Sequence, residues 1–515
     1  NKPGSFWSDL FYYLEAVRPN ANRVHVKPRQ TPEWDSQNWR PDVSDARLDL
    51  IDMTKKDLRK FRNSHASYVQ SAIPALAPRI PFVPFTSGVV TTAGAHNFGQ
   101  VISMLLMLRY TNSTLPVQIM LDTTADWIDE LCADLSGPIA RLNATCIPLR
   151  DAWTDPAPGS SPPPWQLKSG YQWKIMSIMA SSFQSILFLD ADALPILNPD
   201  GILAPGSQPF LSTGLITWPD FWTSTISKHF YAIAGPTPSG LGITPPPLTS
   251  RTSSESGIIA IDKARHADTI LLAAYYNYHG PGAYYPLLTQ HSHGEGDKET
   301  LLQAALVLEA LASKGAYKPP TDWIVALKKK AATSSSEETT AKTIATTKKG
   351  YYDVKALPRV HGQSARDIGW RGMFMQQMDP MEDYRAVMAA LETERQKSGA
   401  EEGFLPTDAH YTDSRFLAAT GNLSISQDVG RYMFWHHNGV KLNFMRVGEK
   451  SAEITAVDEK GRLIRLWGDP EWIIRYTGGR DVEMDLWRDS MEIWCRHTDF
   501  KGVCERMREV WEEVY

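Results

Sequence analysis

Ile186-Leu187-Phe188-Leu189-Asp190-Ala191-Asp192 is the strongest structural signal in the sequence. Consecutive apolar residues of this kind are typical of a strand buried on both faces of a parallel sheet. We predict such a strand over Ser185–Leu189. The two acids follow it directly, and ligands of open α/β sheets bind outside the carboxyl ends of the strands. The segment therefore predicts an α/β protein with a candidate site at Asp190 and Asp192.

The residues before this segment alternate between strand and helix patterns. Small residues follow the first expected strand, and we predict that Thr91-Thr92-Ala93-Gly94 forms a turn whose N–H groups can bind a phosphate. The turn has no GxGxxG, so a dinucleotide fold is not predicted. The alternation predicts a mostly parallel central sheet flanked by helices. Strands are expected at Pro81–Val90, Leu115–Leu121 and Thr145–Leu149, and helices at 46–72, Phe98–Leu108, Ala125–Leu135 and Tyr171–Phe183.

The chain divides into three parts by composition. Residues 1–79 read as a stem with a helical segment, in which 1–45 packs loosely. Residues 80–450 form the main α/β domain, and low complexity predicts a mobile loop at 328–349. Apolar residues at helical spacing predict that 451–515 is a mainly helical C-terminal extension packed on that domain.

Charge and hydropathy exclude some partners. The formal net charge is −5, and basic residues do not gather into a stripe, so no nucleic-acid partner is expected. No apolar run reaches the roughly 18 residues of a membrane-spanning helix. The first residue is Asn1 rather than Met, so a membrane anchor upstream of this sequence is one expectation.

Cysteines and glycosylation sequons indicate a lumenal protein. The cysteines fall in two sequence-local pairs without a CxxC, which favours two disulfides over zinc, with free buried thiols as the alternative. They are Cys132 and Cys146, and Cys495 and Cys504. The sequons begin at Asn112, Asn143 and Asn422. Each sequon is a weak signal alone.

Asp190 and Asp192 have the spacing of a cation site. Residues separated by one on an extended segment project to the same side. A divalent cation takes carboxylate ligands and neutralises a diphosphate leaving group. Asp192 is the stronger candidate for direct metal contact, while Asp190 binds a ribose or a metal-bound water. A solvated acidic pair is the alternative.

A third ligand is expected from residues 433–441, Met-Phe-Trp-His-His-Asn-Gly-Val-Lys. Imidazole binds transition metals such as manganese, and a lysine reaches a phosphate as a point charge. We prefer His436 as the metal ligand, with His437 next, and assign Lys441 to the phosphate. A core histidine is the alternative.

Three further segments carry candidate sugar-binding residues. Their carboxylates suit sugar hydroxyls and their aromatic rings suit stacking, whereas helix capping, solvated loop acids and core packing are the alternatives. In the first segment Asp297 is expected to bind sugar hydroxyls, and in the second Glu255 stands in a loop before a strand. The candidates are Gly296, Asp297, Lys298 and Glu299; Glu255, Ser256 and Gly257; and Trp218, Asp220 and Trp222.

These motifs in this order resemble the fungal Mnn-type α-mannosyltransferases, glycosyltransferase family 71. The resemblance covers about residues 80 to 445 and is closer to the α-1,2 members, chiefly through Gly294–Thr300. One departure is Gln118, where an acid is expected. The matching segments are Gly88–Gly94, Leu115–Ile119, Leu142–Cys146, Lys174, Leu187–Asp192, Trp218–Trp222, Glu255–Gly257, Gly294–Thr300, Met375–Gln377 and His436–Lys441.

The resemblance implies a GT-A fold with a DxD motif at a strand end, for which 80–450 is the catalytic domain. It implies a GDP-mannose donor, Mn²⁺ and a mannan or glycoprotein glycan as acceptor. By resemblance, Thr91, Thr92, Ala93 and Lys174 are cofactor-binding residues, and Gln377 and His437 are substrate-binding residues. Asp297 and Glu255 are the candidate catalytic residues. No general base is assigned, because the leaving phosphate can accept the acceptor proton in a retaining reaction.

The same resemblance implies a type II single-pass Golgi membrane protein, with its anchor upstream of Asn1, and a partner role in a Golgi glycosylation complex. Three alternatives stay open: an α-1,3-mannosyltransferase, a UDP-sugar transferase of the same fold, and an inactive lectin-like subunit. A hydrolase is disfavoured, because two acids separated by one residue are not the facing carboxylate pair of a glycosidase.

Overall fold

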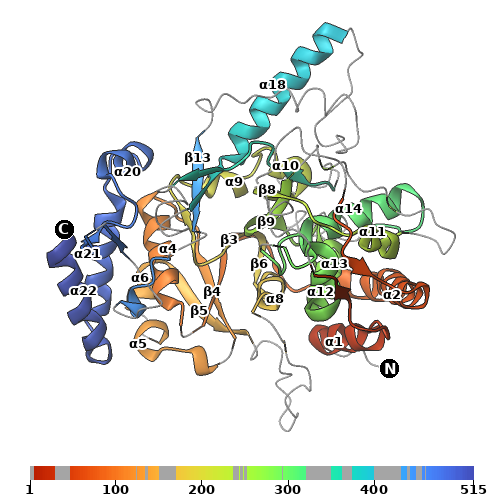
Figure 1. Ribbon diagram of the computed structural model, residues 1–515, viewed down its shortest axis with the longest axis horizontal. Helices are drawn as coiled ribbons and strands as arrows, with labels where there is room; N and C mark the ends of the chain where they lie inside the picture. Colours follow the sequence, from red (N-terminus) through yellow and green to blue (C-terminus); the bar gives the residue numbers. More distant parts are fainter. Residues whose placement is uncertain are drawn as a thin grey trace, which may run out of the picture.

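A computed structural model describes most of the protein (Figure 1). The sequon asparagines Asn112 and Asn143 lie within it, whereas Asn422 and residues 328–348 of the predicted mobile loop fall outside the described residues. The described residues are 5–28, 47–94, 96–122, 124–133, 137–149, 167, 170–235, 243, 248, 252–292, 294–320, 349–361, 374–398, 431–437, 441–447, 455–458 and 460–515.

A seven-stranded sheet with the strand order β10-β8-β9-β6-β3-β4-β5 forms the centre of the fold. The strands β6, β3, β4 and β5 pair in parallel, as do β10 and β8, whereas β9 is antiparallel to both of its neighbours. The sheet is therefore mixed, with a parallel N-terminal half as the sequence predicts. The strands are β3 (Val83–Ala93), β4 (Val117–Leu121), β5 (Ala144–Pro148), β6 (Phe183–Leu189), β8 (Leu215–Thr223), β9 (Thr252–Asp262) and β10 (Tyr352–Asp353).

Helices cover both faces of this sheet because its central strands are apolar on both faces. Along β6, Leu187 and Leu189 pack on the face of α4 (Phe98–Tyr110), whereas Ile186 and Phe188 pack on the opposite face with α8 (Gln172–Ala180) and α12 (Ala267–Tyr278). In Figure 1, α4 and the C-terminal helices stand on one side of the strands, and α12 stands on the other.

The remaining helices complete these two layers. Three C-terminal ones, α20 (Pro470–Tyr476), α21 (Val482–Trp494) and α22 (Lys501–Val514), bury Trp487, Trp494 and Met507 in the core that α4 also enters. The others are α1 (Phe6–Ala16), α2 (Lys55–Ser67), α3 (Ile73–Leu76), α5 (Asp129–Cys132), α6 (Pro138–Arg141), α9 (Asp200–Leu203), α10 (Phe210–Thr213), α11 (Lys228–Ala234), α13 (Tyr285–Thr289), α14 (Thr300–Ser313) and α18 (Pro380–Ser398).

A second, four-stranded sheet stands next to the first, with the strand order β11-β12-β13-β7. Only the three residues Asp190–Asp192 separate the end of β6 from the start of its strand β7, so this segment joins the two sheets. The sheet is antiparallel throughout. Its strands are β7 (Ala193–Pro195), β11 (Arg359–His361), β12 (Phe374–Met378) and β13 (Tyr432–His437). Two small antiparallel sheets of two strands each, β1–β2 (His25–Val26, Ile51–Asp52) and β14–β15 (Ala456–Val457, Leu463–Ile464), lie outside these sheets.

The N-terminal predictions need two corrections. The helix expected over 46–72 starts only at Lys55, because Ile51–Asp52 pairs with β1 and the Thr54 side chain caps α2 by accepting the Asp57 N–H at 3.0 Å. Loose packing is wrong for Phe6–Ala16, because helix α1 buries Leu10, Phe11 and Leu14 completely.

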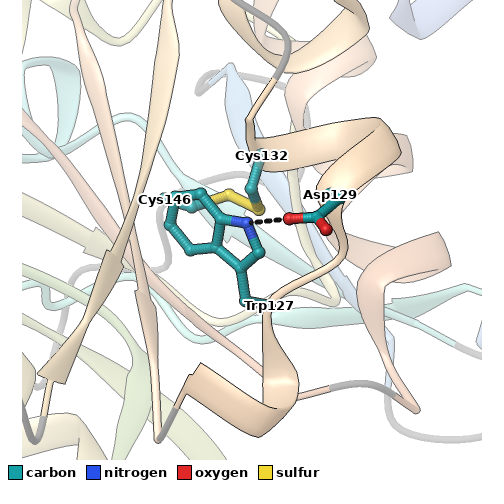
Figure 2. The surroundings of a disulfide bond; sticks show 4 residues. All are labelled: Trp127, Asp129, Cys132 and Cys146. Carbon is teal, nitrogen blue, oxygen red and sulfur yellow. Dashed lines mark hydrogen bonds between the residues drawn. A yellow bond between two sulfur atoms is a disulfide. The ribbon is translucent and has the colours of Figure 1, made fainter.

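Two predictions inside the main domain are also wrong. Residues Thr91–Ala93 form no turn, because they continue β3 and pair in parallel with Ile119–Leu121. The helix expected over Ala125–Leu135 is reduced to the short α5 and a 3-10 turn. Trp127 lies between the 3-10 turn and α5, and its indole N–H donates to Asp129 at 2.9 Å (Figure 2).

The two cysteine pairs form disulfides, as predicted. Cys132 at the end of α5 is bonded to Cys146 in β5, so this bond ties a short helix to an outer strand of the sheet (Figure 2). Cys495 after α21 is bonded to Cys504 in α22. Within the described residues, no helix is long and apolar enough to span a bilayer.

Candidate active site

The Asp190–Asp192 segment turns sharply between the two sheets. The Asp190 N–H donates to the Gly257 carbonyl at 2.7 Å, and the Ala193 N–H donates back to the Asp190 carbonyl at 2.9 Å. On the other side, the His437 N–H donates to the Asp192 carbonyl at 3.0 Å. Backbone hydrogen bonds to β9 and β13 therefore fix both aspartates at the end of β6.

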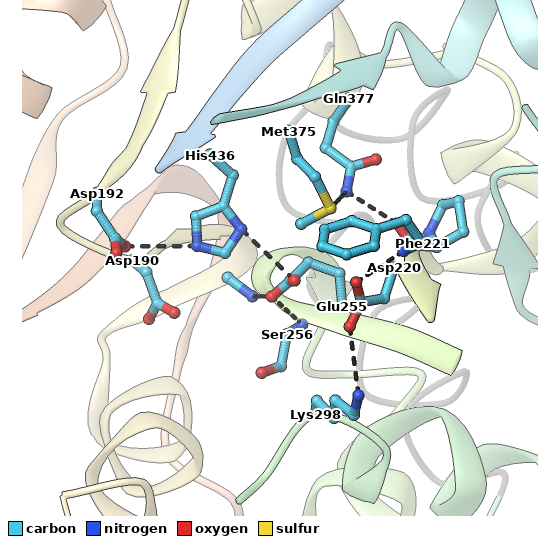
Figure 3. Close-up of polar contacts among 12 residues, drawn as sticks. Asp190, Asp192, Asp220, Phe221, Glu255, Ser256, Lys298, Met375, Gln377 and His436 are labelled. Carbon is cyan, nitrogen blue, oxygen red and sulfur yellow. Dashed lines mark hydrogen bonds and ion pairs between the residues drawn. The ribbon is translucent and has the colours of Figure 1, made fainter. Parts of the chain in front are cut away.

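Asp190, Asp192 and His436 form a cluster with the donor set of a metal site. One ligand atom from each residue lies within 4.8 Å of the others. His436 reaches the aspartates because it is paired with Ala193, directly after Asp192, in the β13–β7 ladder. Figure 3 shows its ring pointing toward the two acids. The structure therefore groups His436, rather than His437, with the aspartates.

Gly257 and Glu255 in β9 determine the position of the His436 side chain. A Cβ on Gly257 would lie 2.6 Å from His436 Cε1 and 3.2 Å from Asp190 Oδ2, so only glycine leaves room for both side chains. Glu255 accepts the Ser256 and Gly257 N–H groups at 2.7 Å each and lies 3.5 Å from His436 Nδ1. A carboxylate on the second ring nitrogen orients a metal-binding histidine. The loop expected around Glu255 is wrong, because these residues belong to β9.

The electrostatic field at the cluster attracts positive charge. Burial opposes charge on His436, but Glu255 and Asp192 raise its pKa well above the usual value. Burial also opposes the charge on Asp192, yet Lys441 and His436 hold its pKa far below the usual value. Lys441 forms an ion pair with Asp192 while its side chain stays 42% exposed. A divalent cation among these ligands would meet the same attraction that raises the pKa of His436.

Lys174 forms ion pairs with Asp190 and Asp297. Its buried ammonium donates to Asp190 Oδ2 at 3.0 Å and to the Ser256 carbonyl at 2.8 Å, and it lies 3.2 Å from Asp297 Oδ2. Burial alone would lower the pKa of Lys174, but Asp190 and Asp297 raise it. For Asp190, burial raises the pKa against the opposing effect of Lys174. Asp297 also accepts the Ser256 hydroxyl at 3.1 Å and caps no helix with its side chain.

Asp220 and Lys298 form a further buried pair on the other side of Glu255 (Figure 3). Lys298 Nζ lies 3.3 Å from both Asp220 Oδ2 and Ser253 Oγ. Burial raises the pKa of Asp220 to about 6, Lys298 opposes this rise and Glu255 adds to it. Every lysine of the site is therefore paired with an acid, whereas the acids Glu255 and Asp220 lie near each other and repel.

These charged residues line a cavity of about 680 Å³. Most predicted site residues line it, and the exposed Tyr171 lines it as well, a residue that the sequence placed only within a helix. The predicted residues that line it are Thr92, Lys174, Asp190, Asp192, Asp220, Trp222, Glu255, Ser256, Asp297, Lys298, His436, His437 and Lys441.

Besides two glycines, five predicted binding residues do not line the cavity. Trp218 is completely buried, donates its indole N–H to the Met378 carbonyl at 2.9 Å and packs edge-on against Phe434, so it fills the core. The fully buried Gln377 donates to the Pro219 carbonyl at 2.8 Å (Figure 3). Glu299 accepts the Ser254 N–H at 3.2 Å beneath β9. Thr91 and Ala93 are buried in β3.

Two predicted glycines act through their neighbours. Gly257 makes room for His436, as described above, and Gly296 lies against the Tyr171 ring, which a Cβ on Gly296 would approach to 2.9 Å. Tyr171 was missed because a residue just before a helix carries no sequence signal of exposure. Asn97 and Gln100, at the start of α4, also line the cavity without a preceding prediction.

The raised pKa of Asp220 predicts a dependence of stability on pH. The unfolded carboxyl loses its proton near pH 4, whereas the folded one keeps it up to about 6. The folded state therefore binds more protons between these values, and stability falls as the pH rises from 4 to 6. Relative to Asp220→Asn, we expect the wild type to lose roughly 2–3 kcal/mol over this interval. Urea unfolding of both proteins at several pH values measures the difference, and parallel profiles would contradict the assignment.

Comparison with known proteins places this site in a family. A sequence model described as "Mannosyltransferase putative" matches residues 86–245 and 247–345, which include both aspartates, Lys174, Glu255 and Asp297. The chain belongs to this mannosyltransferase family. The match ends before His436, so the histidine joins the site from a segment beyond the matched residues.

Curated fungal relatives agree with this family. The chain is 31% identical over 282 residues to alpha-1,2-mannosyltransferase MNN2 of Saccharomyces cerevisiae, covering 50% of this chain and 45% of the relative. It is 33% identical over 291 residues to MNN5 of the same species, covering 48% and 47%. It is 30% identical over 366 residues to MNN21 of Candida albicans, covering 61% and 53%. The chain thus spans about half the length of these relatives.

Among solved structures, the glycosyltransferase GlyE of Streptococcus pneumoniae TIGR4 matches 42% of this chain and 43% of its own, at 13% identity and a TM-score of 0.25. The bifunctional glycosyltransferase WbbM matches 46% of this chain and 46% of its own, at 11% identity and a TM-score of 0.24.

Proposed function

We propose that this protein transfers mannose from GDP-mannose to a mannose residue of a mannan or glycoprotein glycan, forming an α-1,2 linkage. The observation that carries the proposal is the cluster of Asp190, Asp192 and His436 in a cavity that also holds three lysines. The relatives named as alpha-1,2-mannosyltransferases support mannose and this linkage. The mixed sheet with the aspartates at the end of β6 supports a GT-A type fold.

The residues of the cluster fit Mn²⁺. Two carboxylates and an imidazole are ligands that suit this ion, and the acids Asp192 and Glu255 beside His436 attract positive charge. Asp190, Asp192 and His436 would hold the ion, and Glu255 would orient the histidine. When bound, the ion neutralises the negative charge that develops on the diphosphate leaving group.

The lysines and acids of the cavity bind different parts of the donor. Lys441 is the most exposed of the three lysines and can move from Asp192 to a phosphate oxygen. Lys174 is fixed by Asp190 and Asp297, so it orients these acids rather than a ligand. Asp220, Asp297 and Trp222 line the same cavity and can bind sugar hydroxyls or the flat face of a sugar. No side chain is assigned as nucleophile or general base in this retaining scheme.

Nucleotide binding separates the donor alternatives. We expect GDP with Mn²⁺ to raise the melting temperature, because a ligand that binds only the folded state stabilises it. GDP without the metal should raise it less. Stabilisation by UDP and not by GDP would replace the mannose donor with a UDP-sugar.

The product of the reaction tests the remaining alternatives. The protein is incubated with GDP-mannose, Mn²⁺ and α-mannobiose, and the product is analysed for its linkage. A trimannoside with a new α-1,2 bond is the expected result, and an α-1,3 bond would change the linkage. Binding of mannobiose without any transfer would favour a lectin-like subunit.

The proposed location is the Golgi lumen, with a type II anchor upstream of this sequence and partners in a glycosylation complex. Both disulfides support an oxidising compartment. Two sequon asparagines, Asn112 and Asn143, are exposed and accessible to glycosylation. Endoglycosidase treatment of the protein expressed in a fungal host should lower its apparent mass, and Asn112→Gln with Asn143→Gln should reduce that shift.

A further inference from the structure

Two more cavities adjoin the catalytic one. A cavity of about 520 Å³ shares Tyr171 and Glu295 with it. This second cavity in turn shares Arg23, Pro281 and Gly282 with a third of about 590 Å³. Each falls in the range of about 300–1,000 Å³ in which proteins bind small ligands. The three are therefore consecutive, and the last two have no role in the mechanism proposed above.

Tyr171 stands where the first cavity meets the second. It is 53% exposed although it is a large aromatic residue. Its ring lies against the backbone of Gly296, where a Cβ would come within 2.9 Å, and it meets the Tyr285 ring edge-on at 6.3 Å. The ring is thus supported by its neighbours while more than half of the residue's surface stays exposed. Such a ring can stack on the apolar face of a pyranose.

Arg23 stands where the second cavity meets the third. The Val24 N–H donates to the Gly282 carbonyl at 2.9 Å, which fixes this segment on the turn Gly280–Tyr284. Gly282 has a φ of +80°, and a Cβ there would lie 2.6 Å from Arg23 Nε. The arginine therefore lies across the glycine. Its guanidinium forms no hydrogen bond or ion pair with the described part of the chain.

The other ionised residues of the outer cavities are already paired. Glu15 accepts from Arg18 at 2.7 Å and from the Tyr278 hydroxyl, and Glu295 is paired with His291. These pairs leave the Arg23 guanidinium as the main uncompensated charge of the two cavities, and it carries five N–H donors. The donors of Arg23 can bind the hydroxyl groups of a neutral sugar, and the exposed ring of Tyr171 in the same cavity suits a sugar rather than a simple anion. The catalytic cavity, with its several lysines and acids, has a different character.

We propose that the three cavities form one acceptor groove, which binds a linear neutral oligosaccharide of several hexose units. The reacting unit lies beside Asp190 and Asp192, Tyr171 stacks on the following unit, and Arg23 donates hydrogen bonds to a unit further out. The identity of the reacting sugar rests on the proposed function, whereas binding of the oligosaccharide in the groove does not require transfer.

Acceptor length tests the outer part of the groove. In transfer assays, Arg23→Ala should raise the KM for an α-linked mannopentaose about tenfold more than the KM for α-mannobiose, because only the longer acceptor reaches the arginine. Arg488→Ala, which changes an exposed arginine of α21, is the matched control and should leave both values unaltered. An equal change of both KM values in Arg23→Ala would overturn the assignment of Arg23.

The stacking role of Tyr171 has its own pair of variants. Tyr171→Ala should raise the KM for mannopentaose about fivefold, and Tyr171→Phe should restore it, because the ring stacks without its hydroxyl. A role of the hydroxyl rather than the ring would leave Tyr171→Phe as weak as Tyr171→Ala, and that result would overturn the stacking assignment.

Calorimetric titration with mannopentaose, in the absence of any donor, separates the groove from the proposed function. Weaker binding by Arg23→Ala than by the wild type supports the groove even if no mannose is ever transferred, and in that case the proposed function alone fails. Equal binding by both proteins, or none by the wild type, overturns the groove while leaving transfer to short acceptors intact.

Discussion

Asp192→Asn is expected to lower the rate of mannose transfer about 10³-fold at saturating GDP-mannose and Mn²⁺. Asp192 is buried between Lys441 and His436, and its strongly lowered pKa keeps it ionised. An amide of the same size removes the negative charge that would hold the cation, and single groups that stabilise transition-state charge are worth about 10²–10³ in rate. Release of GDP in a coupled assay measures the loss, and binding of the acceptor should persist.

Two companion variants give this result its meaning. Asp52→Asn changes an aspartate that is 75% exposed and forms an ion pair with Lys27, and it should keep full activity. Asp190→Asn should be impaired too, and its impairment relative to Asp192→Asn compares the direct and indirect roles of the two acids. Full activity of Asp192→Asn would remove this residue from the metal site.

The parallel half of the fold could be predicted because the apolar residues of β6 indicate burial on both faces of the strand. Successive residues such as Ile186 and Leu187 pack in different cores on opposite faces of the sheet, so a fully apolar strand implies helices on both faces. The position of Thr91–Ala93 could not be predicted in this way. Small residues are typical of turns, but here they extend β3, since their partners in β4 supply the hydrogen bonds.

The aspartates of the site could be predicted from the chain, but their partners depend on tertiary pairing. His436 meets Asp192 only because β13 pairs with β7, and no local pattern specifies that pairing. The two tryptophans of β8 show the opposite failure. Trp218 and Trp222 would share one face of a regular strand, yet the ladder shifts register between Thr217 and Pro219, so one fills the core and the other lines the cavity.

Lys174→Met is expected to cost about 3–5 kcal/mol of the free energy of unfolding, in addition to its effect on transfer. The ammonium lies 3.0 Å from Asp190 Oδ2 and 3.2 Å from Asp297 Oδ2, and its side chain is only 11% exposed. Methionine fills similar volume but leaves the buried carboxylate of Asp297 and the partly buried carboxylate of Asp190 without this counter-charge, and breaking a buried ion pair from one side costs about this much. Urea unfolding at pH 7 measures the loss.

A second substitution shows whether charge or packing causes this loss. Asp297→Asn in the Lys174→Met background should recover part of the stability, because it removes one of the two uncompensated charges. Without the lysine, burial should raise the pKa of Asp190 further, so the deficit should shrink as the pH falls. Lys228→Met, at an exposed pair with Asp49, should cost less than about 0.5 kcal/mol. A loss in Lys174→Met that is independent of pH and unchanged by Asp297→Asn would mean that Lys174 acts through packing, and the acids around it would then not depend on its charge.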